Sequence, residues 1–189
     1  LAEPQRAWAQ LPLGGALQSQ LIGTNANAPS IEPLTLVELV ARQVRQQPDA
    51  IALSDKDGDL SYSRLDACAT LLAHRLVAAG IGPGVPVGIL FARSNAAIVA
   101  MLAVLKAGGA YVPIDPTYPA DRRAYMLTDS AIAHIVVSAE LADSVPASLQ
   151  RFVLDDLATP DLGDLPTLPL PDANDLAYLI YTSGSTGAP

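Results

Sequence analysis

Short apolar runs that favour β-strand alternate along this chain with segments that carry a helical pattern of apolar residues. The strand-like runs occupy residues 85–91, 111–114, 132–137 and 151–154. Strands separated by helices usually pair in parallel, and a parallel sheet needs cover on both of its faces. The alternation therefore predicts an α/β fold that is built on a mostly parallel sheet.

An amphipathic helix is predicted where this regular pattern begins. Leu36, Val40 and Val44 recur at i, i+4 and i+8, a spacing that places apolar residues on one helical face. Residues 50–54 then favour a short buried strand. The charged, glycine-containing residues 55–59 favour a turn after it.

The next predicted helix has clear boundaries. Ser61 is a typical N-cap residue, and Gly80 is typical of the position just beyond a helix C-terminus. An apolar stripe between them is formed by Leu65, Cys68, Leu72 and Leu76. Because Cys68 lies on this stripe, we expect a packed core thiol rather than a nucleophile.

Two more helices are expected among the strands. The first should bury one apolar face, formed by Ile98, Met101, Leu102 and Leu105. The second should cover residues 121–129. Residues 155–171 favour an irregular connection, and residues 1–33, low in charge and rich in Gln, Asn, Gly and Pro, favour a linker.

A loop of small residues follows the apolar, β-prone run 176–181. Its residues are Thr182, Ser183, Gly184, Ser185, Thr186 and Gly187. Glycines let the backbone approach a ligand so that N–H groups converge on anionic oxygens, and hydroxyls add donors without bulk. The pattern predicts a polyphosphate-binding loop, with a Ser/Gly surface turn as the alternative. The Gly-x-x-x-x-Gly-Lys-Ser/Thr pattern is absent, so a P-loop NTPase is not supported.

Composition excludes several classes of function. The 189 residues include 19 acidic and 11 basic ones, a net charge of −8, and no basic stripe that would indicate a nucleic-acid surface. Cys68 is the single cysteine, so no internal disulfide forms and a reducing compartment is expected. His74 and His134 have no partners at metal-ligand spacing, and no apolar stretch is long enough to predict a membrane-spanning helix.

Three segments, in order, resemble core motifs of the adenylation domains of nonribosomal peptide synthetases. They are residues 60–65 (Leu-Ser-Tyr-Ser-Arg-Leu), residues 105–122 and residues 176–189, the last resembling the phosphate-binding loop. The second segment contains Ala-Tyr-Val-Pro-Ile-Asp-Pro, which resembles the peptide-synthetase branch more than the acyl-CoA ligases of the same adenylate-forming superfamily. Arg64 stands where the family usually has Glu, so the first motif is a weaker match.

The resemblance implies a place within such a domain. Residues 34–189 would be the N-terminal part of its large subdomain, and residues 1–33 the linker from an upstream condensation domain. The enzyme would bind ATP and Mg²⁺, activate an amino acid as its adenylate, and transfer it to the phosphopantetheine thiol of a carrier domain. Phosphate binding would fall to Thr182, Ser183, Gly184, Ser185, Thr186 and Gly187.

No catalytic residue and no metal ligand is assigned in this chain. We expect Lys106 to favour a helix C-terminus, Asp115 to form a turn and Arg122 to pair at the surface. The family's lysine-containing continuation, its acid pocket and its C-terminal domain would lie beyond Pro189, so we expect this segment alone to be inactive.

The expected partners are an amino-acid substrate, the carrier and condensation domains, and the remainder of the adenylation domain, in this or a second chain. An MbtH-like protein is a further candidate partner, and neither nucleic acid nor membrane is expected. The expected location is cytoplasmic. Two alternatives stay open, namely an acyl- or aryl-CoA ligase of the same superfamily and a non-catalytic docking fragment.

Overall fold

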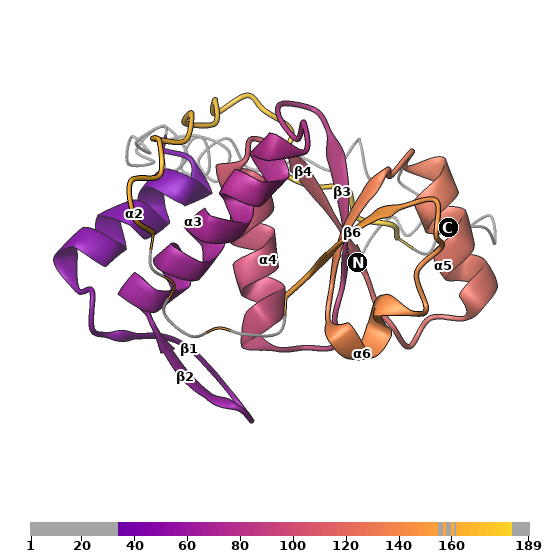
Figure 1. The fold of residues 1–189 in the computed structure, drawn as a ribbon, viewed down its shortest axis with the longest axis horizontal. Helices are drawn as coiled ribbons and strands as arrows, with labels where there is room; N and C mark the ends of the chain where they lie inside the picture. Colours follow the sequence, from indigo (N-terminus) through magenta and orange to yellow (C-terminus); the bar gives the residue numbers. More distant parts are fainter. Residues whose placement is uncertain (1–33, 155–156, 158–159, 161, 183–189) are drawn as a thin grey trace, which may run out of the picture. The chain divides into compact units, whose positions relative to one another are not determined.

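A four-stranded parallel sheet forms the centre of the computed structural model, which describes residues 34–154, 157, 160 and 162–182 (Figure 1). Its strands are β3 (Pro86–Leu90), β4 (Ala110–Ile114), β5 (His134–Val137) and β6 (Gln150–Val153). They lie in the order β4-β3-β5-β6, and every neighbouring pair is parallel. The predicted α/β fold with a mostly parallel sheet is confirmed, and the four strand-like runs coincide with its strands.

Strand β3 comes first in the sequence and lies inside the sheet, and the later strands lie on both sides of it. Helix α4 (Asn95–Lys106) connects β3 to β4, and helix α5 (Ala120–Asp129) carries the chain back to β5 on the other side of β3. The two helices cover opposite faces of the sheet (Figure 1). Because all strands are parallel, their carboxyl ends share one edge, which is where α/β proteins usually bind ligands.

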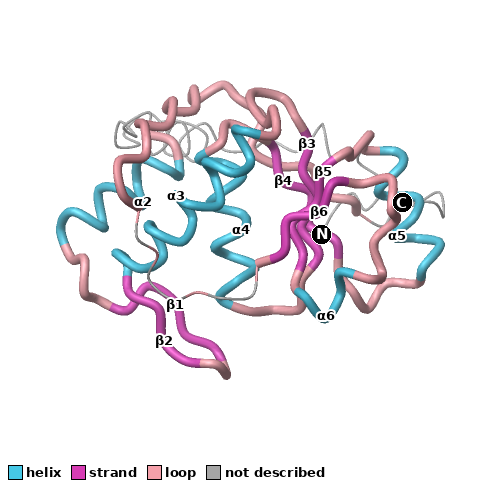
Figure 2. The backbone as a smooth tube through the Cα atoms, viewed as in Figure 1, coloured by secondary structure: helices cyan, strands magenta, loops and turns pink. Residues whose placement is uncertain are grey.

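Helices α2 (Leu36–Gln46), α3 (Tyr62–Ala78) and α4 form the layer on the first face of the sheet (Figure 2). Alternate strand residues point into this layer, as the two-residue period of a strand requires. The core on this face includes Leu72, Leu76, Val87, Ile89, Val99, Val104 and Val136. This is the larger of the two apolar clusters.

Helix α5 covers the second face, where Met126 is only 1% exposed. The strand residues packed around it are Leu90, Val112, Ile114, Ile135 and Val137. A short helix α6 (Ala139–Ala142), which the sequence did not predict, joins β5 to β6. Both faces of the sheet are therefore covered, as its apolar strands require.

The predicted boundaries of α3 are confirmed. The Ser61 hydroxyl accepts a hydrogen bond from the Arg64 N–H at 3.3 Å, and Gly80 follows the helix with φ +89°. Cys68 is buried on the predicted stripe, in the core between α3 and its neighbours. Within the described residues, no helix is both long and apolar enough to cross a membrane.

The strand predicted at residues 50–54 is present as β1 (Ile51–Asp55), but it is not buried. It forms a separate antiparallel hairpin with β2 (Gly58–Ser61), and the tight turn between them lies within the predicted turn at residues 55–59. Ile51 is 62% exposed, because the hairpin lies beside the helices and does not join the parallel sheet (Figure 2).

Two predicted helix faces were wrong in part. Ile98 is 41% exposed, whereas most of the small residues of α4 are buried, because this helix packs against α3 as well as against β3 and β4. In α2 the buried residue is Val37, and Leu36 is 55% exposed. Alanine and valine let α4 approach both neighbours, which a single-stripe prediction does not anticipate.

Candidate functional site

The segment before the predicted phosphate loop runs along the free side of β4. The Tyr111 N–H donates to the Ala177 carbonyl at 3.1 Å, and the Leu179 N–H donates to the Tyr111 carbonyl at 3.0 Å. These bonds form a parallel bridge between Tyr111 and Tyr178. The predicted strand 176–181 is thus reduced to a single bridge, since among the described residues β4 is the only strand beside it.

The parallel direction brings Tyr181 to the carboxyl edge of the sheet. Its hydroxyl donates a hydrogen bond of 2.7 Å to the Asp129 carboxylate at the end of α5. The rings of Tyr181 and Tyr125 meet edge to face at 6.2 Å. Burial and the Asp129 carboxylate raise the pKa of Tyr181 to about 12, so at neutral pH the hydroxyl is a neutral donor.

A groove of about 500 Å³ lies at the same edge, between the carboxyl ends of β3 and β4. Arg93 and Asp115 line it together with the aromatic rings of Phe91, Tyr118 and Tyr181. Hydrogen bonds from the hydroxyl and N–H of Thr117 hold the pKa of Asp115 below its ordinary value, and Arg93 adds to this effect. The groove therefore presents one cation and one firmly ionised carboxylate.

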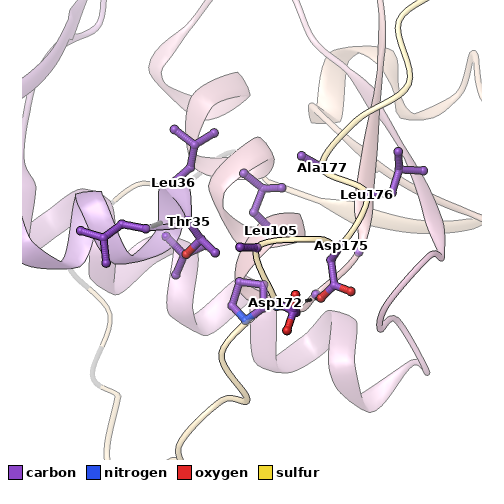
Figure 3. Close-up of a pocket in the computed structure, with 13 residues that line it drawn as sticks. Thr35, Leu36, Leu105, Asp172, Asp175, Leu176 and Ala177 are labelled. Atoms are coloured by element: carbon purple, nitrogen blue, oxygen red, sulfur yellow. Dashed lines mark hydrogen bonds between the residues drawn. The ribbon is translucent and has the colours of Figure 1, made fainter. Parts of the chain in front are cut away.

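A second, smaller pocket of about 160 Å³ lies at the opposite edge, near the start of β4 (Figure 3). Leu36, Leu105 and Leu176 give it a mostly apolar lining. Its polar groups bond locally, since the Asp175 carboxylate accepts from the Asp172 N–H at 2.8 Å. No polar groups converge here on a ligand, so we place the candidate site at the carboxyl edge.

A model of one protein family matches residues 40–189, and its description is AMP-binding enzyme. The match covers most of the chain and both of the segments that meet at the carboxyl edge. The chain belongs to the AMP-binding enzyme family.

The curated relatives of this AMP-binding enzyme are much longer proteins. One of the linear gramicidin synthase polypeptides of Brevibacillus parabrevis is 39% identical over the whole of this chain, which spans 4% of that protein. Tyrocidine synthase 3 of the same species is 38% identical, again over the whole chain and 3% of its own length. The chain therefore corresponds to a small part of each relative.

Solved structures of a nonribosomal peptide synthetase, FmoA3, share the fold. One form matches with a TM-score of 0.77 and 30% identity over 88% of this chain and 18% of that one. Another form, with α-methyl-L-serine-AMP bound, matches with a TM-score of 0.74 and 29% identity, over 88% of this chain and 19% of its own.

The six predicted phosphate-binding residues of this AMP-binding enzyme are described only at their start. Thr182 is exposed and directly follows Tyr181 at the carboxyl edge. Outside the described residues lie Ser183, Gly184, Ser185, Thr186 and Gly187.

Other residues that the sequence analysis considered have structural surroundings. Asp115 forms the expected turn with Thr117, and Arg122 lies over the Tyr118 ring at 4.3 Å. His134 packs beside Phe152, with ring centroids 6.3 Å apart. In the part of the chain that the structure describes, no three His, Cys, Asp or Glu side chains are grouped as a metal site would require.

Sequence reasoning missed the role of Asp129. This carboxylate holds Tyr181 from 52 positions away, and it ends a helix whose pattern gives no sign of such a partner. The one feature of the sequence that could have suggested a tyrosine contact for Asp129 is Tyr125, because the two residues share one helical face at i, i+4.

Proposed function

We propose that this chain is the N-terminal part of an adenylation domain in nonribosomal peptide synthesis. Such a domain activates an amino acid with ATP and loads it as a thioester on a carrier domain. The main support is the position of Thr182, the first residue of the hydroxyl- and glycine-rich sequence, at the carboxyl edge of a parallel sheet. The names of the relatives favour this branch of the superfamily over the acyl- or aryl-CoA ligases.

The loop would act by binding the β- and γ-phosphates of ATP. Donors to the phosphate oxygens would be the hydroxyls of Thr182, Ser183, Ser185 and Thr186 and the N–H groups around Gly184 and Gly187. Phosphoryl transfer of this kind depends on positioning and on neutralising charge, so the chain needs no nucleophilic side chain here.

The donor set fits ATP, because Thr182 is exposed at the edge where the remaining hydroxyls follow in sequence. Mg²⁺ would supply charge neutralisation on the phosphates. It usually retains waters and binds through phosphate oxygens with one or two carboxylates. Such binding does not require the three-ligand protein cluster that is missing from the described residues.

The remaining assignments concern the larger protein. Residues 1–33 would form the linker to an upstream condensation domain, and residues 34–189 the first part of the adenylation domain. Phosphopantetheine on the carrier domain would accept the activated amino acid. An MbtH-like protein and a remainder of the domain on a second chain would be further partners, and the protein would be cytoplasmic.

ATP–pyrophosphate exchange on the full-length protein that carries this chain tests the function. We expect exchange that depends on one or a few amino acids, followed by covalent loading of the phosphopantetheinylated carrier domain. A matched reaction with fatty and aryl acids and coenzyme A is the control. Exchange driven only by those acids, with acyl-CoA as the product, would reject the proposal in favour of a CoA ligase.

A further inference from the structure

The carboxyl edge holds a contact that the phosphate-loop hypothesis does not use. We propose that Tyr181, held by Asp129, is a positioning residue that fixes where the phosphate loop leaves the sheet. This inference rests on the proposed function, because it assigns the loop at residues 182–187 to ATP.

The segment that leads to the loop is held by hydrogen bonds of its backbone and of one side chain. The backbone bonds to Tyr111 fix Ala177 and Leu179 beside β4, but they end before the loop begins. Tyr181 supplies the next attachment, and it does so through its side chain, directly before Thr182. The position of Thr182 therefore depends on α5 as well as on the sheet.

The side on which Tyr181 lies follows from the period of an extended segment. Leu179 and Tyr181 are two residues apart, and both pack against the apolar cluster beneath α5. Met126, on the same helix as Asp129, is buried in that cluster with 1% exposure. Asp129 is thus presented by a helix that the core holds firmly, as a positioning contact requires.

The position of Asp129 also points to a dedicated contact. A carboxylate on the last residue of a helix meets the negative end of the helix dipole, which disfavours it. The Tyr181 hydroxyl at 2.7 Å, with the Tyr125 hydroxyl at 3.4 Å, offsets this by donating toward the carboxylate. The negative charge of Asp129 is therefore favourable for binding the Tyr181 hydroxyl and unfavourable for the stability of α5 by itself.

Tyr181 is poorly suited to a role in proton transfer. Its hydroxyl proton is donated to Asp129, and its pKa of about 12 keeps it neutral near pH 7. A general acid or base works best with a pKa near the pH of the reaction. Positioning is the role that this geometry supports.

The test compares four variants of the full-length protein. Y181F removes the hydroxyl and keeps the ring against Tyr125, D129A removes the acceptor, and D129N keeps an acceptor oxygen at the same place. Y178F is the matched control, since it removes a hydroxyl from the same segment while its ring remains against Tyr111 at 5.6 Å. Hydrogen–deuterium exchange of the peptide after Tyr181, KM for ATP and the melting temperature are measured for each.

We expect Y181F and D129A each to raise KM for ATP by about three- to tenfold, the usual effect of losing one hydrogen bond of ordinary strength. Amides of residues 182–187 should exchange faster in both variants, and combining the two changes should add little. D129N and Y178F should resemble the wild type in both measurements.

Three results would overturn the proposal. Unchanged loop exchange in Y181F and D129A would show that the contact does not position the loop. A lower melting temperature with unchanged KM would reduce the contact to a purely structural one. If D129A behaved like the wild type while Y181F did not, the effect of Tyr181 would not depend on Asp129. If the wild type catalyses no ATP exchange, the proposed function fails by itself, and the deuterium measurement still decides whether Tyr181 positions the loop.

Discussion

The Lys106 ammonium group lies 2.6 Å from the Asp66 carboxylate and 2.7 Å from the Thr70 hydroxyl, and it joins the end of α4 to α3. The Lys106 side chain is only 10% exposed and that of Asp66 is 28% exposed. Position 106 was expected to favour the helix C-terminus, and Lys106 is indeed the last residue of α4. The ion pair gives the same residue a second role, which helix position alone does not predict.

Removing one partner of this pair should destabilise the protein more than removing both. K106M leaves Asp66 partly buried without its cation, and we expect a loss of about 1–3 kcal/mol. The double variant K106M/D66L replaces both charges with apolar groups, so its loss should be smaller. Unfolding followed by thermal denaturation or pulse proteolysis measures both. Equal losses in the two proteins would show that desolvation of Asp66 is unimportant.

Changing Thr182 and Ser183 to Ala should weaken ATP–pyrophosphate exchange well before it weakens stability. Thr182 is exposed, so its hydroxyl contributes little to the fold, whereas two phosphate donors would be lost. We expect exchange to fall by about tenfold or more. S148A, at an exposed serine before β6, is the control for loss of a surface hydroxyl. An unaltered exchange rate in the double variant would remove the phosphate assignment.

Gly109 should not tolerate a methyl group. A Cβ at this position would lie 2.7 Å from Ile81 Cγ2 and 3.2 Å from the Val85 carbonyl oxygen. G109A is therefore expected to cost about 1–3 kcal/mol through overpacking. G82A is a close control, because a Cβ there meets nothing within 4 Å. If the two variants unfold at the same temperature, the contacts around Gly109 relax without cost.

The contribution of Asp55 should disappear in acid. Hydrogen bonds from the Asn95 N–H at 2.7 Å and from the Asp57 N–H lower the pKa of Asp55 below its ordinary value of 3.8. A lowered folded-state pKa means that this stabilisation is complete above pH 3.8 and is lost as the pH falls through the folded value. The difference in unfolding temperature between wild type and D55A should therefore be present at pH 7 and shrink below about pH 4. A difference that stays constant into acid would contradict this assignment.

The sequence predicted the sheet well because its signals are local. Each of the four strand-like runs coincides with a strand, and Ser61 and Gly80 mark the ends of α3 through their own backbone preferences. Burial was harder to predict, since the exposed side of Ile98 depends on how α3 and the sheet enclose α4.

The candidate site was predicted in part for the same reason. The glycine and hydroxyl pattern from Thr182 onward is local and visible in the sequence. The contact between Tyr181 and Asp129 joins two segments that only folding brings together, so no periodicity could indicate it. Strand β1 and the turn after it were predicted, whereas β2 was missed because it is short and only partly apolar.

The bridge between Tyr111 and Tyr178 joins a segment that is synthesised early to one that is synthesised later. A ribosome synthesises β3, β4 and α5 before it reaches residues 177–181. The residues of β4 and α5 therefore leave the ribosome before Tyr181 does. The segment that leads to the predicted phosphate-binding loop is the last of these partners to become available, so its contacts with Tyr111 and Asp129 form only after both of those residues have been synthesised.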